Sequence, residues 1–186
     1  SACDEVARGF RIDPRRARVV PVTDDAVVLC GRTQDGAVVK GQVAVAGTHG
    51  LRDVWVDPDC TAASTIAIEA LRAADLVLLG PGSLYTSVLA AAVVGDIRKA
   101  LAYVGVRVGY VANLRADGAE THGCDVSDHV AALQRHGIHP DLVVTQRGGL
   151  PVGATDVEVL EADVADERGA LHDPDRLGQA LRSLLP

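Results

Sequence analysis

The stretch from Asp75 to Ser87 constrains the fold more than any other part of this sequence. The run from Asp75 to Leu79, which is apolar after its first residue, leads into Gly80-Pro81-Gly82, and a segment of helical composition begins at Thr86. An apolar run bounded by turn residues is typical of a strand that is buried on both faces of a parallel sheet. The stretch therefore predicts a strand, a tight turn and a helix in succession.

Helices and strands are expected to alternate around this turn. Such alternation predicts βαβ units with right-handed crossovers. The predicted helices are Ser64–Ala74, Thr86–Ala102 and Ser127–Arg135, and the predicted strands are Val106–Ala112 and Leu142–Thr145. Val157–Leu160 is a candidate last strand, and Asp173-Pro174 is expected to begin a terminal helix that ends near Leu185.

The part of the chain before Thr61 has a different texture, with short Val-rich runs separated by turn residues. Asp35-Gly36 is a strong hairpin signal between two such runs, so the local pairing should be antiparallel. The predicted strands are Arg18–Val22, Val27–Gly31, Val38–Val45 and Asp53–Val56.

These patterns together predict an α/β fold. Hydrophobic residues make up 48% of the chain and aromatic residues only 3%, so the core must be built from small aliphatic side chains. We predict a Rossmann-like three-layer sandwich with a mostly parallel sheet plus an antiparallel β-hairpin region. A single domain over 1–186 is expected, with a β-rich part at about 18–56 and a βαβ part at about 64–160.

Charge and hydropathy exclude several classes of partner. The net charge of −7 disfavours binding to nucleic acid or to an anionic membrane surface, because either would repel the chain. No apolar run approaches the roughly 20 residues of a membrane span, and the first residues lack a signal-peptide pattern. The four cysteines are widely spaced, which favours reduced thiols over a metal site. We therefore expect a cytoplasmic protein.

The Gly80–Ser87 turn has the composition of an anion site. Glycines let the backbone approach a phosphate, and the start of a helix presents free N–H groups and a positive dipole end. Ser83, Thr86 and Ser87 add hydroxyl groups. On turn chemistry alone, an ordinary strand-to-helix turn explains the same residues about equally well. The string is neither a P-loop nor a dinucleotide-binding fingerprint.

Four motifs in the same order resemble those of the YvcK-like proteins, often called gluconeogenesis factors, whose relatives are the CofD phospholactate transferases. They are the Asp35–Gln42 hairpin, the segment Ala74–Ser87 with its Gly-Pro-Gly-Ser-Leu-Tyr-Thr-Ser string, the loop from Val111 to Gly123, and the helix start Val126–His129. The resemblance covers about Arg18 to Val144. The form of the Gly-Pro-Gly string is similar to the YvcK branch.

The chain also departs from the family pattern. A glycine-rich "GGGTG" loop and an acidic "DDGGSSG" stretch, both expected near the N-terminus of the family, are absent, so half of the expected site is missing. The loop Leu114–Ala119 and the Ala90-Ala91-Ala92 run also differ from the common forms. The first residue, Ser1, is unusual for a natural start, and a fragment or a processed product is expected.

The resemblance implies a UDP-sugar, UDP-N-acetylglucosamine or UDP-glucose, as the ligand of a regulator of cell shape and of growth on gluconeogenic carbon sources. This regulator needs no cofactor. Asn113, Glu120 and Thr121 follow a predicted strand and suit recognition of base or ribose hydroxyls, although a solvated polar loop is the simpler alternative. The predicted ligand-binding residues are Gly80, Pro81, Gly82, Ser83, Leu84, Tyr85, Thr86, Ser87, Asn113, Glu120 and Thr121.

Two alternatives stay open. One is a CofD-like transferase of phospholactyl groups in coenzyme F420 synthesis, which would need Mg²⁺; the other is a truncated, inactive family member. No catalytic residues and no metal site are predicted, since His122, His129 and His136 have no further ligand at suitable spacing. Assembly into a homo-oligomer is compatible with the sequence.

Overall fold

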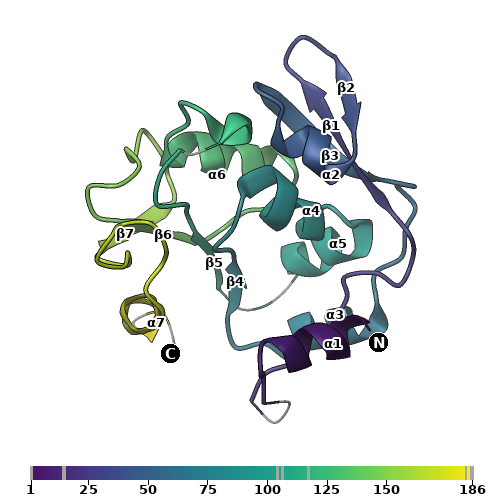
Figure 1. The fold of residues 1–186 in the computed structure, drawn as a ribbon, viewed down its shortest axis with the longest axis horizontal. Coiled ribbons are helices and arrows are strands. Elements are labelled where there is room, and N and C mark those ends of the chain that lie inside the picture. The colour runs from purple at the N-terminus through teal and green to yellow at the C-terminus, as the bar shows by residue number, and fades with distance from the viewer. Residues whose placement is uncertain are drawn as a thin grey trace.

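The structure, a computed structural model, describes residues 2–13, 16–103, 105, 107–116, 118–182 and 184. Its elements form two sheets surrounded by helices (Figure 1). They are α1 (Ala2–Gly9), β1 (Val28–Thr33), β2 (Val38–Lys40), α2 (Gln42–Ala46), β3 (Leu51–Asp57), α3 (Thr65–Arg72), β4 (Val77–Leu79), η1 (Leu84–Leu89), α4 (Ala90–Ala92), α5 (Gly95–Tyr103), β5 (Val108–Val111), η2 (Ala119–Thr121), α6 (Val126–Arg135), β6 (Leu142–Gln146), β7 (Glu158–Ala162) and α7 (Pro174–Arg182).

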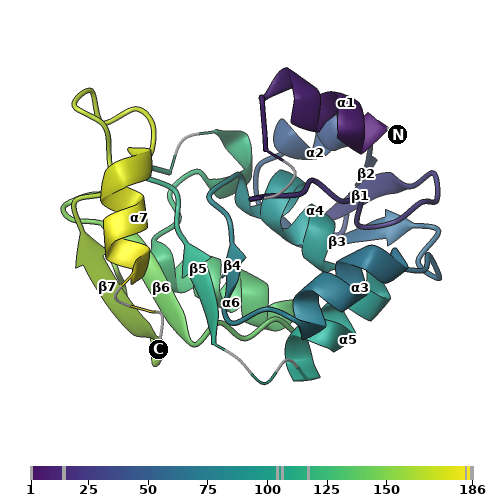
Figure 2. The same cartoon turned by 90° about the horizontal axis from the view of Figure 1, so that it is seen from below.

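The larger sheet is parallel and has the strand order β4-β5-β6-β7. Helices lie on both of its faces, as Figure 2 shows for α7 in front and α6 behind. Alternate residues of β6 point to opposite faces: Val143 joins the main core, whereas Leu142 and Val144 join a second core that Leu177 and Leu181 of α7 cover. The predicted three-layer α/β fold with a parallel sheet is confirmed.

The smaller sheet is antiparallel and has the strand order β2-β1-β3. β1 pairs with β2 in the register Cys30↔Lys40, so the Asp35-Gly36 hairpin is confirmed. β1 also pairs with β3, with Gly31 opposite Val54. This sheet is the antiparallel region that the sequence predicts.

Two of the predicted strands in this region are wrong. Arg18–Val22 is not a strand; Val20 and Val22 instead pack against the core from an irregular segment. The strand predicted over Val38–Val45 ends at Lys40, because Gly41 turns the chain with a φ of 97° and α2 begins at Gln42. Valine-rich composition favours a strand, but packing against neighbouring elements overrides that preference here.

The single helix predicted over Thr86–Ala102 is also wrong, since the structure has three shorter helical elements. A π-helix, η1, begins at Leu84 and runs directly into α4. The helical conformation is then interrupted at Val93 and Val94 before α5 begins. β-Branched valines followed by Gly95 weaken helix propagation at this point. The buried side chain of Val94 fills the core at the break.

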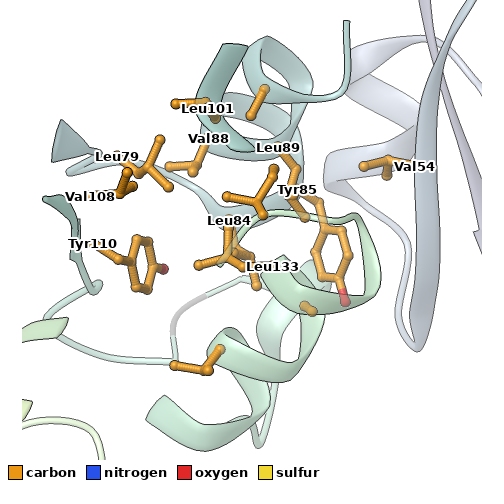
Figure 3. Close-up of a cluster of buried hydrophobic side chains, with 14 of the residues drawn as sticks. Val54, Leu79, Leu84, Tyr85, Val88, Leu89, Leu101, Val108, Tyr110 and Leu133 are labelled. Atoms are coloured by element: carbon orange, nitrogen blue, oxygen red, sulfur yellow. The ribbon is translucent and has the colours of Figure 1, made fainter. Parts of the chain in front are cut away.

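One core connects the two sheets. Figure 3 shows Leu84 and Val88 of the helical segment turned inward with Tyr110 of the parallel sheet, and Val54 of the antiparallel sheet on the far side of Tyr85. The hydroxyl of Tyr85 donates to the carbonyl of Leu51 over 3.1 Å. This core fixes the Gly80–Ser87 turn between the sheets. Among the described helices, none is long and apolar enough to cross a membrane.

Candidate functional site

The ends of β4 and β5 meet at one edge of the parallel sheet. β4 pairs with β5 in the register Leu79↔Tyr110, so the turn after Leu79 lies beside the loop after Val111. A crevice of about 590 Å³ opens there, and we call it the ligand crevice. It is lined by Pro81, Gly82, Ser83, Asn113, Leu114, Arg115, Ala170, Leu171 and His172.

Gly80 makes the close approach of the two strand ends possible. Its φ is 89°, and a Cβ atom added at this position would lie 2.9 Å from the carbonyl oxygen of Val111. A side chain is therefore excluded both by backbone conformation and by space. Gly82 is less crowded, since an added Cβ would meet the Cβ of Ser87 at 3.2 Å.

The turn and the helical segment after it separate the ligand crevice from a second, apolar groove. Ser83 lines the ligand crevice, whereas Gly80, Pro81 and Ser87 line an apolar groove on the other side of the turn. Pro81 lines both. Of the predicted ligand residues, Leu84, Tyr85 and Thr86 are buried at 1%, 4% and 6% exposure. The structure therefore offers a ligand the side chain of Ser83 from this segment and leaves the next three in the core.

Asn113 lies where the sequence predicts. It lies two residues after the end of β5 and lines the crevice, and its side chain makes no hydrogen bond to a residue that the structure describes. The amide group can both donate and accept a hydrogen bond. Asn113 is thus a polar group that faces Gly82 and Ser83 across the crevice and is available to a ligand.

Glu120 and Thr121 are placed differently from the other predicted residues. Both are buried, at 8% and 0% exposure, and neither lines the crevice. Burial raises the pKa of the Glu120 carboxyl group, while the hydroxyl and amide groups of Thr86, the Ser83 hydroxyl and the Tyr85 amide act in the opposite direction. Oε2 of Glu120 and the Thr121 hydroxyl have no hydrogen-bond partner among the described residues. An acidic group of the protein itself therefore lies at the start of η1.

A buried pair of rings lies below the loop that carries Glu120. The hydroxyl of Tyr110 is 2.9 Å from Nδ1 of His129, which has no exposed surface. Burial lowers the pKa of His129 to about 4 and raises that of Tyr110 well above its ordinary value. His129 is therefore neutral near pH 7 and supports the sheet rather than a metal ion. Across the described residues, no group of three or more His, Cys, Asp or Glu side chains could hold a metal.

The second wall of the crevice was missed by sequence reasoning. It comes from Ala170, Leu171 and His172, in the segment before α7, together with Arg115 of the loop after β5. Nη2 of Arg115 donates to the carbonyl of Gly169 over 2.8 Å, which joins the two segments. Burial lowers the pKa of His172, and its Nε2 has no hydrogen-bond partner within the described part of the chain. The only local signal was the His172-Asp173-Pro174 helix start.

The family and the relatives were found by comparison with known proteins. A family model for 2-phospho-L-lactate transferase CofD matches residues 1–174. A gluconeogenesis factor from Halalkalibacterium halodurans is 35% identical over 69% of this chain and 41% of its own length. A Mycobacterium tuberculosis protein named "Putative gluconeogenesis factor" is 37% identical over 97% of this chain and 58% of its own length.

A solved structure agrees with these matches. The crystal structure of a UPF0052 family member from Bacillus halodurans superimposes with a TM-score of 0.83 at 25% identity, over 96% of this chain and 64% of that chain. A Deinococcus radiodurans relative is 35% identical over 91% of this chain and 41% of its own length. The chain thus spans between about two fifths and two thirds of the length of these proteins.

Proposed function

We propose, from the premise that this chain belongs to the CofD family, that it binds a nucleotide-sugar in the ligand crevice and acts as a metabolite-responsive regulator. UDP-N-acetylglucosamine and UDP-glucose are the proposed ligands. The proposed role is in cell shape and in growth on gluconeogenic carbon sources. The relatives that carry the name gluconeogenesis factor are longer than this chain. We therefore propose their role for this chain and do not infer it from the match alone.

The lining of the crevice is the observation that supports the ligand class. The turn at Gly82 and the hydroxyl of Ser83 suit a phosphate group, because backbone and hydroxyl groups can approach it closely. Asn113 suits a base or a ribose, and Leu114 and Leu171 offer apolar contact to a ring. Among the described residues, the lining includes the cation Arg115 and no carboxylate, so its charge favours an anionic ligand in spite of the net charge of −7.

The position of Glu120 refines the proposed mode of binding. Because the carboxyl group of Glu120 already lies at the start of η1 and bonds the Ser83 hydroxyl, we assign the phosphate groups to the backbone at Gly82 and to Arg115 rather than to the end of the helix. Ligand binding there would leave the buried Glu120 in place. Repulsion between two anions at the same helix end is avoided in this arrangement.

The test is thermal unfolding and calorimetric titration of the 186-residue chain with UDP-N-acetylglucosamine, UDP-glucose, GDP and inorganic phosphate, each with and without Mg²⁺. A ligand at about 100 times its Kd adds roughly 2.7 kcal/mol of stability. We expect a rise in Tm with the UDP-sugars that does not depend on Mg²⁺. Absence of a rise with every ligand would contradict the proposal for this chain.

Two serines of the same turn provide a matched pair of variants. Ser83→Ala removes a hydroxyl that lines the ligand crevice and also bonds Glu120, whereas Ser87→Ala removes an exposed hydroxyl from the groove side. A lost hydrogen bond of about 0.5 to 1.5 kcal/mol predicts a 2- to roughly 10-fold weaker binding for Ser83→Ala. Ser87→Ala should bind as the unmodified chain does. Equal losses in both variants would place the ligand elsewhere.

The match to the 2-phospho-L-lactate transferase family favours a second candidate, transfer of a phospholactyl group. Such a reaction on a diphosphate requires Mg²⁺ in the usual case. Mg²⁺ is commonly held by one or two carboxylates, but the described lining of the crevice offers the neutral oxygens of Ser83 and Asn113 and no carboxylate. The described residues do not fit a Mg²⁺ site on their own. Mg²⁺-dependent modification of a deazaflavin alcohol by this chain would establish the transferase instead.

A further inference from the structure

Two exposed histidines lie side by side where the loop before β3 meets the loop before α6. The ring centroids of His49 and His122 are 5.9 Å apart, and the angle between the ring planes is 84°. His49 follows α2 and His122 directly follows η2, so the two residues are distant in the sequence. Sequence spacing groups His122 with His129 and His136, whereas the fold brings it to His49.

The ring nitrogens of both histidines are available to a ligand. Both residues are exposed, and neither ring forms a hydrogen bond with a residue that the structure describes. The buried His136 differs, because one of its nitrogens accepts the N–H of Val54 and the other faces the carbonyl of Ala132. A neutral imidazole nitrogen is the commonest protein ligand of a metal ion. The pair His49 and His122 can therefore offer one nitrogen each.

The separation of the two rings suits a shared metal ion. Metal–nitrogen bonds of about 2.0 to 2.1 Å place two coordinating imidazoles with their centroids roughly 4.5 to 6.5 Å apart, and the observed 5.9 Å lies within this span. In the edge-to-face arrangement, a ring must turn about its side-chain bonds before both nitrogens reach one ion. Exposed side chains change rotamer rapidly, so this adjustment requires no movement of the backbone.

The surroundings leave space for an ion and its water ligands. Gly50 and Gly123 directly follow the two histidines, and a Cβ atom added at either glycine would meet no atom within 4 Å. Among the described residues, no third His, Cys, Asp or Glu joins the pair to form a three-ligand group. Water would complete the coordination, so binding is reversible and weaker than in a closed site with four protein ligands.

We propose that His49 and His122 form a two-histidine site for a divalent transition-metal ion such as Zn²⁺ or Ni²⁺. Imidazole nitrogen suits these ions, whereas Mg²⁺ and Ca²⁺ prefer oxygen ligands. The site is separate from the ligand crevice, which neither histidine lines. It does not depend on the proposed nucleotide-sugar.

A bridging ion would clamp the two segments that hold the start of η1. Gln42 of α2 donates to the carbonyl of Thr86 over 2.9 Å, and Glu120 of η2 interacts with the hydroxyl and amide groups of Thr86. α2 and η2 also contact each other. Because His49 lies shortly after α2 and His122 directly after η2, an ion held by both would keep these partners of Thr86 together. The ion would steady the ligand turn without touching it.

The test uses the 186-residue chain without a histidine tag. Thermal unfolding is followed with Ni²⁺, Zn²⁺ and Mg²⁺, and calorimetric titration measures the Kd and the stoichiometry. A metal ion at about 100 times its Kd should raise Tm by roughly 5 to 11 °C for a chain of this size. We expect this rise with Ni²⁺ and Zn²⁺, with one ion bound per chain. An absence of binding by both ions, or an equal rise with Mg²⁺, would overturn the proposal.

His49→Asn and His122→Asn test the two ligands separately. Each should weaken Ni²⁺ binding by about tenfold or more, because the second bond and the effective concentration that the first provides are lost together. His139→Asn removes an exposed histidine elsewhere, and Cys124→Ser removes the nearby thiol; both should bind as the unmodified chain does. Thermal unfolding without metal verifies that all four variants are folded. A loss in either control as large as that in His122→Asn would assign the ion to other groups.

Amide hydrogen exchange with and without Zn²⁺ tests the clamp. The N–H of Val88 donates to the carbonyl of Ser83 over 3.0 Å at the start of η1, so its exchange reports on the turn. We expect Zn²⁺ to slow this exchange in the unmodified chain and to leave it unchanged in His49→Asn. The measurement needs no nucleotide, so its outcome is independent of the ligand titration. Zn²⁺ binding without slower exchange at Val88 would overturn the clamp.

Discussion

The two sheets of this protein are built from similarly Val-rich strands but differ in burial and in where their polar residues lie. In the antiparallel sheet, burial alternates along β3, and its outer face carries Arg32 over the ring of Trp55 at 5.4 Å. In the parallel sheet, every residue of β5 is buried, and polar residues appear only where the strand ends, at Asn113. When a strand is buried on both faces, a ligand can bind only at the ends of the strand.

The antiparallel sheet supports the site from a distance. Nε2 of Gln42, which follows β2, donates to the carbonyl of Thr86 over 2.9 Å. His136, at the end of α6, accepts the N–H of Val54 at Nε2 over 2.9 Å and faces the carbonyl of Ala132 with Nδ1 at 2.7 Å. The neutral Nδ1–H form satisfies both contacts. The parallel sheet thus frames the crevice, and the antiparallel sheet holds the turn that forms the rim of the crevice.

The largest expected difference between the two regions is at a pair of glycines. Gly80 and Gly36 have nearly the same φ, 89° and 90°, but an added Cβ meets Val111 at Gly80 and only open space at Gly36. Gly36→Ala should destabilise by about 1 to 2 kcal/mol, the cost of a positive φ. Gly80→Ala should destabilise by about 3 kcal/mol or more, because the backbone must also move.

Urea unfolding of both variants measures this difference. If Gly80→Ala and Gly36→Ala lowered the free energy of unfolding equally, the close approach of β4 and β5 at the turn would not be a constraint.

The next effect is a pH dependence that arises below the parallel sheet. Burial lowers the pKa of His129 to about 4, below its ordinary value of 6.5. The stability that comes from its neutral form is complete above pH 6.5 and is lost as the pH falls through about 4. The shift corresponds to roughly 3 kcal/mol at most. His136 contributes with the same sign, since burial also lowers its pKa.

Unfolding free energies between pH 7 and pH 4 measure the effect, and His129→Asn should flatten the curve. Only slopes are compared, because the substitution also changes packing. His139→Asn, at an exposed position, is the matched control and should keep the original slope. Glu120 acts in the opposite sense. Burial raises its pKa, so the stability that comes from its neutral form is lost as the pH rises through the raised pKa. An unchanged slope in His129→Asn would assign the acid sensitivity to other groups.

The smallest effect is expected on the outer face of the antiparallel sheet. Arg32→Ala removes an exposed cation–π contact and should cost about 0.5 to 1 kcal/mol. Lys40→Ala removes an exposed ion pair with Asp57, 2.9 Å long, and should cost less than Arg32→Ala does, because solvent screens the two charges. Thermal unfolding of both variants checks this. A larger loss from either would mean that this face is covered by something in solution.

The sequence by itself determined the strand, the glycine turn, the antiparallel hairpin and the family, because turn residues and hydrophobic period act over a few neighbouring positions. It also placed Gly82, Ser83 and Asn113 correctly at one sheet edge, since parallel strands end on the same side. The UDP-sugar ligand, the absence of a required cofactor, the cytoplasmic location and assembly into a homo-oligomer stay predictions.

Only the tertiary structure decided which distant side chains meet. It put the carboxyl group of Glu120 at the start of η1, gave the crevice a second wall from Leu171 and His172, and broke the predicted long helix where Val94 fills the core. Each of these depends on segments that are separated along the chain and brought together by burial of apolar surface. Local pattern carries no information about such contacts, because the free energy that selects them belongs to the packed core as a whole.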